Sequence, residues 1–233
     1  MFPIRDENPS RHVPFATWAL IAANILFFFR ELALPPQAAE KLIYLYGLVP
    51  ARFLHPEWAA TAGLPVHTYW PFLTTMFLHG GWFHIIGNMW FLWIFGDNVE
   101  DRMGPVRFLV YYLLCGVAAG FVHVITNPAS QVPAVGASGA IAGVMAAYLM
   151  LFPRARILAV FPPFFWLRFR LPAYLYLGFW FLMQFLSGGL AITSRREVGG
   201  IAWWAHVGGF VTGLATFWVF LRPRQKETVN LEL

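Results

Sequence analysis

The chain has 233 residues, of which 59% are hydrophobic and 12% are charged, and its formal net charge at pH 7 is +5. A soluble domain carries about 25% charged residues, and a soluble fold of this length could not bury so much apolar surface, so the composition favours an integral membrane protein. The positive charges lie in short segments between hydrophobic stretches, which is typical of membrane orientation signals and disfavours nucleic acid as a partner. Cys115 is the single cysteine, which excludes an intramolecular disulfide and a cysteine-only metal site.

Stretches without charged residues mark the expected membrane-spanning helices. A helix needs about 20 residues to cross the hydrocarbon core of a bilayer. The stretch 108–153 is long enough for two crossings, and the turn-forming residues 127–133 divide it. We therefore expect an all-α integral membrane bundle of six helices that forms a single domain over residues 1–233. The helices are expected at residues 13–33, 72–96, 105–126, 136–152, 171–190 and 200–221.

The distribution of Lys and Arg predicts the orientation of these helices. If the N-terminus is cytoplasmic, the segments on that side hold eleven Lys and Arg residues and the segments on the other side hold five. Both termini are therefore expected to be cytoplasmic, and the small size of the chain favours a prokaryotic cytoplasmic membrane. The connection 35–70 is rich in apolar residues, so we expect it to lie in or on the outer leaflet.

Polar side chains enter three of the expected helices at a similar depth. His84 and Asn88 lie in the helix 72–96, Ser138 opens the helix 136–152, and His206 lies in the helix 200–221. With a cytoplasmic N-terminus, all three helices run from the outside inwards, which places Ser138 and His206 roughly 10 Å below the outer surface. Polar groups at membrane depth are costly and are usually functional or paired. We predict that the three segments converge on one site.

Ser138 and His206 are the candidates for nucleophile and general base. A serine hydroxyl is a poor nucleophile at neutral pH and needs a neighbouring base. Gly209 and Gly213 share a helix face with His206, and Gly139 follows Ser138, so small residues could let the two helices approach closely. The alternative is that the glycines only pack helices and His206 only forms a structural hydrogen bond.

His84 and Asn88 are the candidates for an oxyanion hole. They are four residues apart and project from one side of their helix, and both side chains can donate hydrogen bonds to a developing oxyanion. The backbone amide of Ser138 is a third candidate donor, because the first N–H groups of a helix have no partner within it. Gly136 and Gly139 leave room for a substrate backbone. The alternative is that His84 and Asn88 form a structural hydrogen-bonded pair.

The sequence offers no carboxylate for a catalytic triad. None occurs between Asp101 and Glu197, and Glu197 is expected near the outer surface, so we infer a Ser–His dyad. His79 and His123 are more typical of structural histidines. A zinc site is disfavoured, because no His-Glu-x-x-His motif is present and nothing supplies a nearby carboxylate base.

These residues together resemble the rhomboid family of intramembrane serine proteases over residues 71–213. The resemblance implies a six-helix core that cleaves transmembrane segments of other proteins, with membrane-protein substrates and the bilayer as partners and with no metal or organic cofactor. It implies that Ser138 is the nucleophile, that His206 is the base, and that His84, Asn88 and the Ser138 amide bind the oxyanion. The motifs that carry it are His84-x-x-x-Asn88, Gly136-x-Ser138-Gly139, Ala205-His206-x-x-Gly209-x-x-x-Gly213 and the run Gly-Asp-Asn-Val-Glu-Asp-Arg-Met-Gly at 96–104.

Two positions depart from the pattern of well-known members. A tyrosine that packs on the catalytic histidine is replaced by Ala142, so another group must orient His206. The Trp-Arg pair of the first outer loop is missing, although Arg52 lies in a similar region. Neither departure affects a catalytic position.

Two other functions fit a polytopic membrane protein with intramembrane histidines. A non-catalytic relative would bind transmembrane segments without cleaving them, but such relatives usually lose the Ser–His dyad that this chain keeps. A transporter with histidines as proton carriers would have charged residues at mid-membrane and often duplicated halves, and the sequence has neither. The substrate and the oligomeric state are left open.

Overall fold

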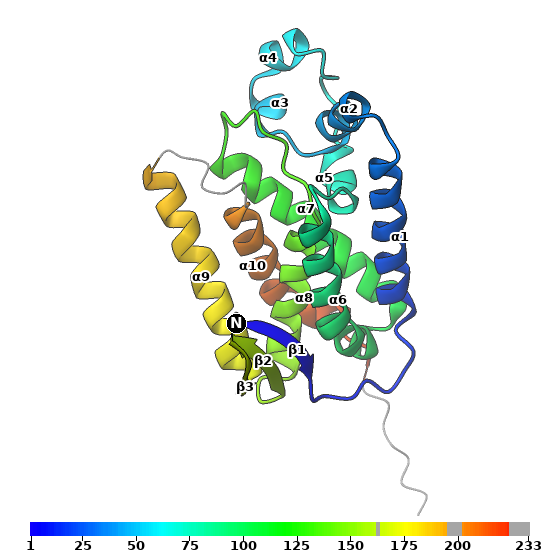
Figure 1. The fold of residues 1–233 in the computed structure, drawn as a ribbon, viewed down its shortest axis with the longest axis vertical. Helices are drawn as coiled ribbons and strands as arrows, with labels where there is room; N and C mark the ends of the chain where they lie inside the picture. The colour runs from blue at the N-terminus through cyan, green and yellow to red at the C-terminus, as the bar shows by residue number, and fades with distance from the viewer. Residues whose placement is uncertain (162–163, 195–201, 224–233) are drawn as a thin grey trace, which may run out of the picture.

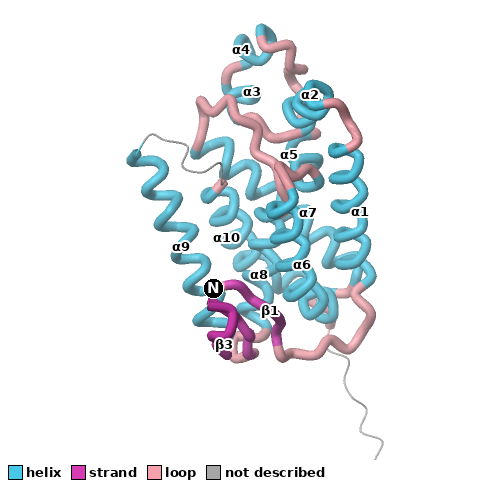
Figure 2. The backbone as a smooth tube through the Cα atoms, viewed as in Figure 1, coloured by secondary structure: helices cyan, strands magenta, loops and turns pink. Residues whose placement is uncertain are grey.

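The structure is a computed structural model that describes residues 1–161, 164–194 and 202–223. Figures 1 and 2 show a bundle of long helices with a small sheet at one end and a group of short helices at the other. The elements in chain order are β1 (Phe2–Asp6), α1 (Phe15–Leu32), α2 (Pro36–Tyr46), α3 (Pro50–Leu54), α4 (Pro56–Thr61), α5 (Pro71–Thr74), the 3₁₀ helix η1 (Thr75–Phe77), α6 (Trp82–Met103), α7 (Pro105–Thr126), α8 (Ser138–Leu151), β2 (Arg156–Phe161), β3 (Phe164–Pro172), α9 (Ala173–Ser194) and α10 (Trp203–Phe220).

Helix α8 is the central element of the bundle. It contacts α6, α7, α9 and α10, and its side chains are buried without a break from Gly139 to Tyr148. A helix that is apolar on every side is typical of a position surrounded by other helices. Ser138 is therefore attached to the start of the helix that the rest of the bundle encloses.

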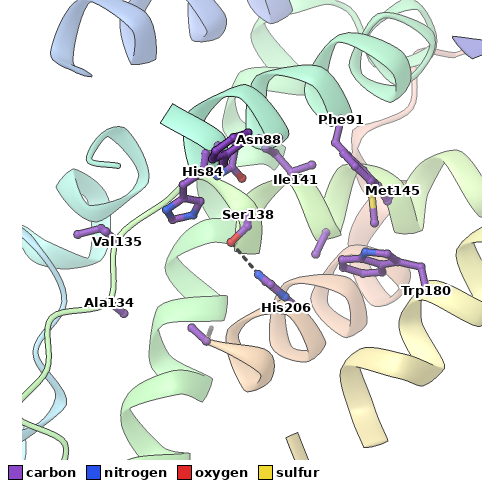
Figure 3. A pocket seen from close by; sticks show the side chains of 14 residues that line it. His84, Asn88, Phe91, Ala134, Val135, Ser138, Ile141, Met145, Trp180 and His206 are labelled. Carbon is purple, nitrogen blue, oxygen red and sulfur yellow. Dashed lines mark hydrogen bonds between the residues drawn. The ribbon is translucent and has the colours of Figure 1, made fainter. Parts of the chain in front are cut away.

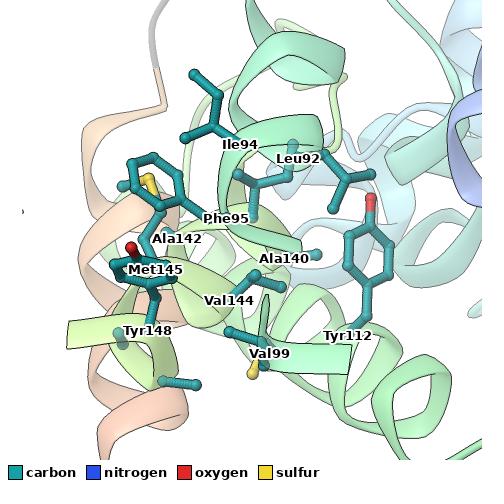
Figure 4. Close-up of a cluster of buried hydrophobic side chains, with 14 of the residues drawn as sticks. Leu92, Ile94, Phe95, Val99, Tyr112, Ala140, Ala142, Val144, Met145 and Tyr148 are labelled. Atoms are coloured by element: carbon teal, nitrogen blue, oxygen red, sulfur yellow. The ribbon is translucent and has the colours of Figure 1, made fainter. Parts of the chain in front are cut away.

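The core between α6 and α8 follows the helical repeat. Leu92, Phe95 and Val99 recur at helical spacing on α6 and are fully buried. Figure 4 shows this row facing side chains of α8, among them Val144 and Tyr148. The rings of Phe95 and Tyr148 meet edge to face with their centroids 5.0 Å apart, a favoured geometry for aromatic pairs. This contact fixes the distance between α6 and α8, which both supply residues to the site.

Helices α8 and α10 approach so closely that only glycine fits between them. A Cβ atom on Gly213 would lie 2.6 Å from the carbonyl oxygen of Gly143, and one on Gly143 would lie 2.5 Å from Cβ of Cys115 on α7. The Tyr111 hydroxyl donates a hydrogen bond of 2.7 Å to that same Gly143 carbonyl. The close packing of these two helices, expected from their small residues, is present in the structure.

The expectation of an all-α chain is wrong at one end of the bundle. Strands β1, β2 and β3 form an antiparallel sheet in that order, with Phe2 opposite Val160 and Arg156 opposite Pro172. The segment between α8 and α9, which carries four arginines, is only a connection between the expected helices 136–152 and 171–190. β2 pairs with β3, which follows it directly in the sequence, and with β1 from the N-terminal residues, and the second pairing is so distant in sequence that it leaves no local signal.

The helix expected at 72–96 is divided and shifted. Residues 71–77 form α5 and η1, and α6 begins at Trp82, after Gly80 and Gly81. Gly81 has φ of 153°, which is not a helical conformation, so the helix cannot continue through it. A residue with a side chain would adopt this φ only with strain. At its other end α6 extends through several charged residues to Met103, and Gly104, with φ of 81°, stops it. His79 consequently precedes the helix that carries His84 and Asn88.

Three helices among the described residues are long and apolar enough to cross a membrane, namely Phe15–Leu32, Pro105–Thr126 and Ala173–Ala191. Helix α8 is apolar but shorter, with 14 residues. Exposed apolar side chains cover α9, including Phe179, Leu182 and Leu186. This distribution is that of an integral membrane protein, in which lipid covers the outer apolar face.

The connection 35–70 contains the short helices α2, α3 and α4, which lie at the end of the bundle opposite the sheet (Figure 1). Arg52 is buried among them. Its Nε donates to Pro65 O at 2.9 Å, its Nη1 donates to Leu45 O at 2.9 Å, and its Nη2 donates to the Thr68 hydroxyl. One guanidinium thus joins three separate parts of this connection.

Candidate active site

Ser138 and His206 lie in direct contact. Nε2 of His206 is 2.7 Å from Oγ of Ser138, and Figure 3 shows the two side chains pointing at each other from α8 and α10. Both are half-buried. The predicted convergence of these two helices is therefore present at hydrogen-bonding distance, the geometry that a nucleophile and its base require.

Gly136 and Gly139 shape the entry to α8. Gly136 has φ of 123°, a conformation that L side chains rarely adopt, and its N–H donates to Thr75 O at 2.9 Å. A Cβ atom on Gly136 would lie 2.6 Å from Nε2 of His84. On Gly139 it would lie 2.6 Å from Cβ of Ala119. Glycine at these two positions lets the chain turn beside His84 and start α8 at Ser138.

His84 and Asn88 face the same cavity from α6. They project from neighbouring turns, and Figure 3 shows them beside Ser138. Nδ2 of Asn88 donates to the backbone carbonyl of His84 at 3.0 Å. Asn88 is buried and His84 is half-buried. The structure thus brings together the four polar side chains that the sequence singled out.

The cavity that these residues line has a volume of about 510 Å³. Its other walls are largely apolar, with Phe91 from α6, Ile141 and Met145 from α8 and Trp180 from α9. Figure 3 shows Met145 and Trp180 on the far side of the cavity from His84. A mostly apolar cavity with a few convergent polar groups is typical of a site that binds an apolar ligand in a fixed orientation.

Helix α9 supplies contacts to His206 that the sequence analysis missed. Nδ1 of His206 is 2.7 Å from Oε1 of Gln184, and the ring of His206 lies beside that of Trp180 with the centroids 5.8 Å apart. Gln184 is 7% exposed. One signal could have identified it, because it is the only amide in the uncharged stretch 171–194, and a polar side chain at membrane depth usually has a partner.

The two remaining histidines of this region lie apart from the dyad contact. His79 is buried, its backbone N–H donates to Oε2 of Glu31 at 3.3 Å, and its ring lies edge to face with that of His84. His123 on α7 is joined through Nδ1 to the side chain of Asn127 at 3.3 Å. Within the described part of the chain, no three His, Cys, Asp or Glu side chains are grouped to hold a metal ion. Glu197 lies outside the described residues.

Comparisons with known proteins show which sequences this chain is similar to. The chain is 36% identical over 154 residues to the human presenilin-associated rhomboid-like protein, mitochondrial, and this match covers 62% of the chain and 36% of that protein. It is 32% identical over 126 residues to rhomboid-like protein 11, chloroplastic, of Arabidopsis thaliana, covering 53% and 41% of the two chains. It is 29% identical over 119 residues to a protein named as a candidate rhomboid protease in Bacillus subtilis (strain 168), covering 49% and 59%.

The match to the human protein spans about a third of that protein's length. The family model described as the Rhomboid domain matches residues 66–223, which contain α5 to α10 and every candidate site residue. This match covers more than half of the chain and confirms the resemblance seen in the sequence motifs. The chain therefore belongs to the rhomboid family and is an integral membrane protein of that family.

Proposed function

We propose that this chain is an intramembrane serine endopeptidase that cleaves transmembrane segments of other membrane proteins. The observation that carries the proposal is the 2.7 Å contact between Oγ of Ser138 and Nε2 of His206 beside a largely apolar cavity. Membership of the rhomboid family and the naming of a bacterial relative as a candidate protease support the same reaction class. The proposed reaction uses no metal or organic cofactor and no nucleic acid.

The proposed chemistry is acyl transfer in two steps. Oγ of Ser138 attacks the scissile carbonyl carbon while its proton passes to Nε2 of His206. The C–N bond then breaks, the departing amine takes that proton, and an acyl ester remains on Ser138. A water molecule next gives a proton to Nε2 and attacks the ester carbonyl, so that the carboxylic product leaves and Oγ regains a proton.

The oxyanion formed in each step is assigned to three donors. They are the side chains of His84 and Asn88 and the backbone N–H of Ser138, and these three residues all line the cavity. Nδ2 of Asn88 donates to the backbone carbonyl of His84, and a substrate oxyanion would be the stronger acceptor because it is charged. Removing one oxyanion donor from a serine protease costs about 10²-fold to 10³-fold in kcat.

We further propose that the chain forms one domain whose six helices α1, α6, α7, α8, α9 and α10 all cross the bilayer. Helix α8 has 14 residues and is therefore about 21 Å long, which is about 9 Å short of a hydrocarbon core of about 30 Å. Other helices enclose α8, so the bilayer need not become thinner to match its short length. Ser138 at its start would then lie below the outer surface, within reach of water from that side.

The proposed orientation places the sheet end on the cytoplasmic side and α2, α3 and α4 at the opposite surface. Arg156, Arg168 and Arg170 belong to the sheet, and basic residues favour the cytoplasmic face. We propose that the connection carrying α2 to α4 rests in the outer leaflet. The mitochondrial and chloroplastic names of relatives favour an organellar membrane over the prokaryotic membrane expected from the sequence, although a bacterial relative also matches.

The test uses the full chain in proteoliposomes with a reporter transmembrane substrate. Ser138→Ala and His206→Ala should each abolish cleavage while the thermal unfolding transition stays close to that of the wild type. A fluorophosphonate probe should label the wild type and not Ser138→Ala. Full cleavage by Ser138→Ala would disprove the assignment. Failure of the folded wild type to cleave any substrate or react with the probe would favour a non-catalytic binding protein.

A further inference from the structure

His206 presents two ring nitrogens to two different helices, and only one of them faces Ser138. Nε2 is 2.7 Å from Ser138 Oγ on α8, whereas Nδ1 is 2.7 Å from Oε1 of Gln184 on α9. We propose that Gln184 is a positioning residue, which accepts a hydrogen bond from Nδ1–H and thereby sets the tautomer and the plane of the His206 ring. This inference rests on the proposed function of the Ser138–His206 pair.

The chemistry of the amide oxygen selects the useful tautomer. A neutral imidazole carries one N–H, and a carbonyl oxygen has lone pairs but no proton. With Oε1 next to Nδ1, the ring proton is held on Nδ1, and the lone pair of Nε2 is left to accept the proton of Ser138. When the ring takes up that proton, both nitrogens become donors, and the dipole of the Gln184 carbonyl stabilises the positive charge at Nδ1.

An amide is suited to this task inside a membrane protein. A charged carboxylate without a partner would be costly to bury at this depth, whereas a neutral amide is less expensive to bury. Gln184 is buried in a helix that has no charged residue, so its amide has exchanged contact with water for the contact with His206. The same contact explains how His206 is held in place although Ala142 stands where well-known members have a tyrosine.

Contacts one turn away on either side hold Gln184 in register with His206. Towards the centre of the bundle, the rings of Phe181 and Phe210 stack with their centroids 4.5 Å apart. In the other direction, Nε1 of Trp204 donates to the carbonyl of Gly188 at 3.0 Å. A slide of α9 along α10 would break both contacts, so the position of the amide oxygen follows from the packing of the two helices.

The other groups around the ring leave this role to Gln184. Trp180 lies beside the ring, with an angle of 35° between the two planes, so it can restrict the tilt of the imidazole but offers no acceptor to Nδ1. The titratable side chains of the other packed helices that interact electrostatically with His206 are His84 on α6 and His123 on α7. Neither is a carboxylate, so neither could supply the acceptor of a conventional triad.

The test compares two substitutions at Gln184 in proteoliposomes, with kcat and KM measured for the reporter substrate across pH. Gln184→Leu keeps the approximate volume but removes the acceptor, so kcat should fall about 10-fold to 100-fold with KM almost unchanged. Gln184→Glu restores an acceptor and should recover part of that kcat. Because a carboxylate stabilises the imidazolium, the acidic limb of the pH–activity profile of Gln184→Glu should move to higher pH than in the wild type.

Met183→Leu is the matched control, because Met183 is the preceding residue of α9 and is exposed, and this variant should keep the wild-type kcat and profile. The rate of fluorophosphonate labelling measures the reactivity of Ser138 in the absence of a substrate. This rate should also be lower in Gln184→Leu than in the wild type. A wild-type kcat in folded Gln184→Leu would overturn the proposal. So would an unshifted pH profile in Gln184→Glu. Failure of the proposed function itself would instead appear as activity or labelling retained in Ser138→Ala.

Discussion

A Cβ atom added to Gly209 would lie 1.9 Å from the carbonyl oxygen of Gly139, the residue after Ser138. The backbones of α10 and α8 therefore touch one turn below the contact between His206 and Ser138. No rotamer can relieve such an overlap, because the clashing atom belongs to the backbone. The closeness of these two glycines sets the distance across which the Ser–His pair can interact.

Gly209→Ala should separate α8 from α10 and impair both stability and catalysis. Overpacking a tight contact costs typically about 1–3 kcal/mol, and a clash with backbone should lie at the upper end of that range. Displacement of His206 from Ser138 should lower cleavage by at least tenfold in the fraction that remains folded. Thermal unfolding in detergent and cleavage of the reporter substrate would measure the two effects.

Gly189→Ala on α9 is the control for that substitution, because a Cβ atom there meets no other atom within 4 Å. Alanine has a higher helix propensity than glycine, so this variant should be as stable as the wild type or slightly more stable. If Gly209→Ala and Gly189→Ala behave alike, the close approach of α8 and α10 is not what positions the pair.

Glu100 on α6 should be needed for the N-terminal end of α1. Its carboxylate accepts hydrogen bonds from the backbone N–H groups of Ala16 and Thr17 at 2.9 and 2.8 Å and from the Thr17 hydroxyl at 2.8 Å. Glu100→Ala would leave these buried donors without their acceptor, at a cost of about 2–4 kcal/mol for losing charge-assisted bonds. The unfolding temperature should fall clearly, and hydrogen exchange at the start of α1 should become faster. Glu40→Ala on the exposed face of α2 should change neither quantity.

Asp6 should make the stability of the protein depend on pH. Burial raises the pKa of Asp6 from 3.8 to about 6, and hydrogen bonding from the Tyr148 hydroxyl offsets part of this rise. The folded state therefore holds this proton more tightly than the unfolded state. The resulting stabilisation is complete below about pH 4 and is lost as the pH rises through about 6.

Asp6→Asn removes the titration while keeping an oxygen that can accept from Tyr148 and Asn98. The unfolding temperature of this variant should match that of the wild type near pH 4 and exceed it at pH 7. Measurements at several pH values in detergent would show whether the difference grows across this range. A difference that stays constant with pH would contradict the assignment of the titration to Asp6.

Arg52 should hold the connection between α1 and α5 in its shape. The guanidinium donates to Leu45 O, Pro65 O and the Thr68 hydroxyl. Arg52→Lys keeps the charge but cannot reach three separated acceptors with one ammonium group. We expect faster proteolysis within residues 45–68, with the unfolding temperature of the bundle lowered much less. Arg30→Lys at an exposed position on α1 should leave proteolysis unchanged, and equal effects of the two variants would disprove the role of Arg52.

The sequence by itself determined the membrane class and the family, and it predicted four of the polar residues that line the cavity. Charge-free stretches long enough to cross a bilayer indicate membrane-spanning helices, because lipid can cover their apolar side chains. Polar side chains are costly within such helices, and this cost identified Ser138, His206, His84 and Asn88 as candidates. Small residues at helical spacing indicated which helices approach closely. These patterns lie within single helices, so they can be recognised without the tertiary structure.

The tertiary structure alone decided the sheet and the partner of His206. Phe2 and Val160 pair although about two thirds of the chain separates them in the sequence, and such a pairing follows from how the helices bring the two segments to one end. Gln184 could be recognised from the sequence as an isolated polar residue, but its partner could not. The side that an amide on α9 faces depends on the register of α9 against α10, which the Phe181–Phe210 and Trp204–Gly188 contacts set. Packing between helices, rather than any pattern within one of them, placed an acceptor at Nδ1 of His206.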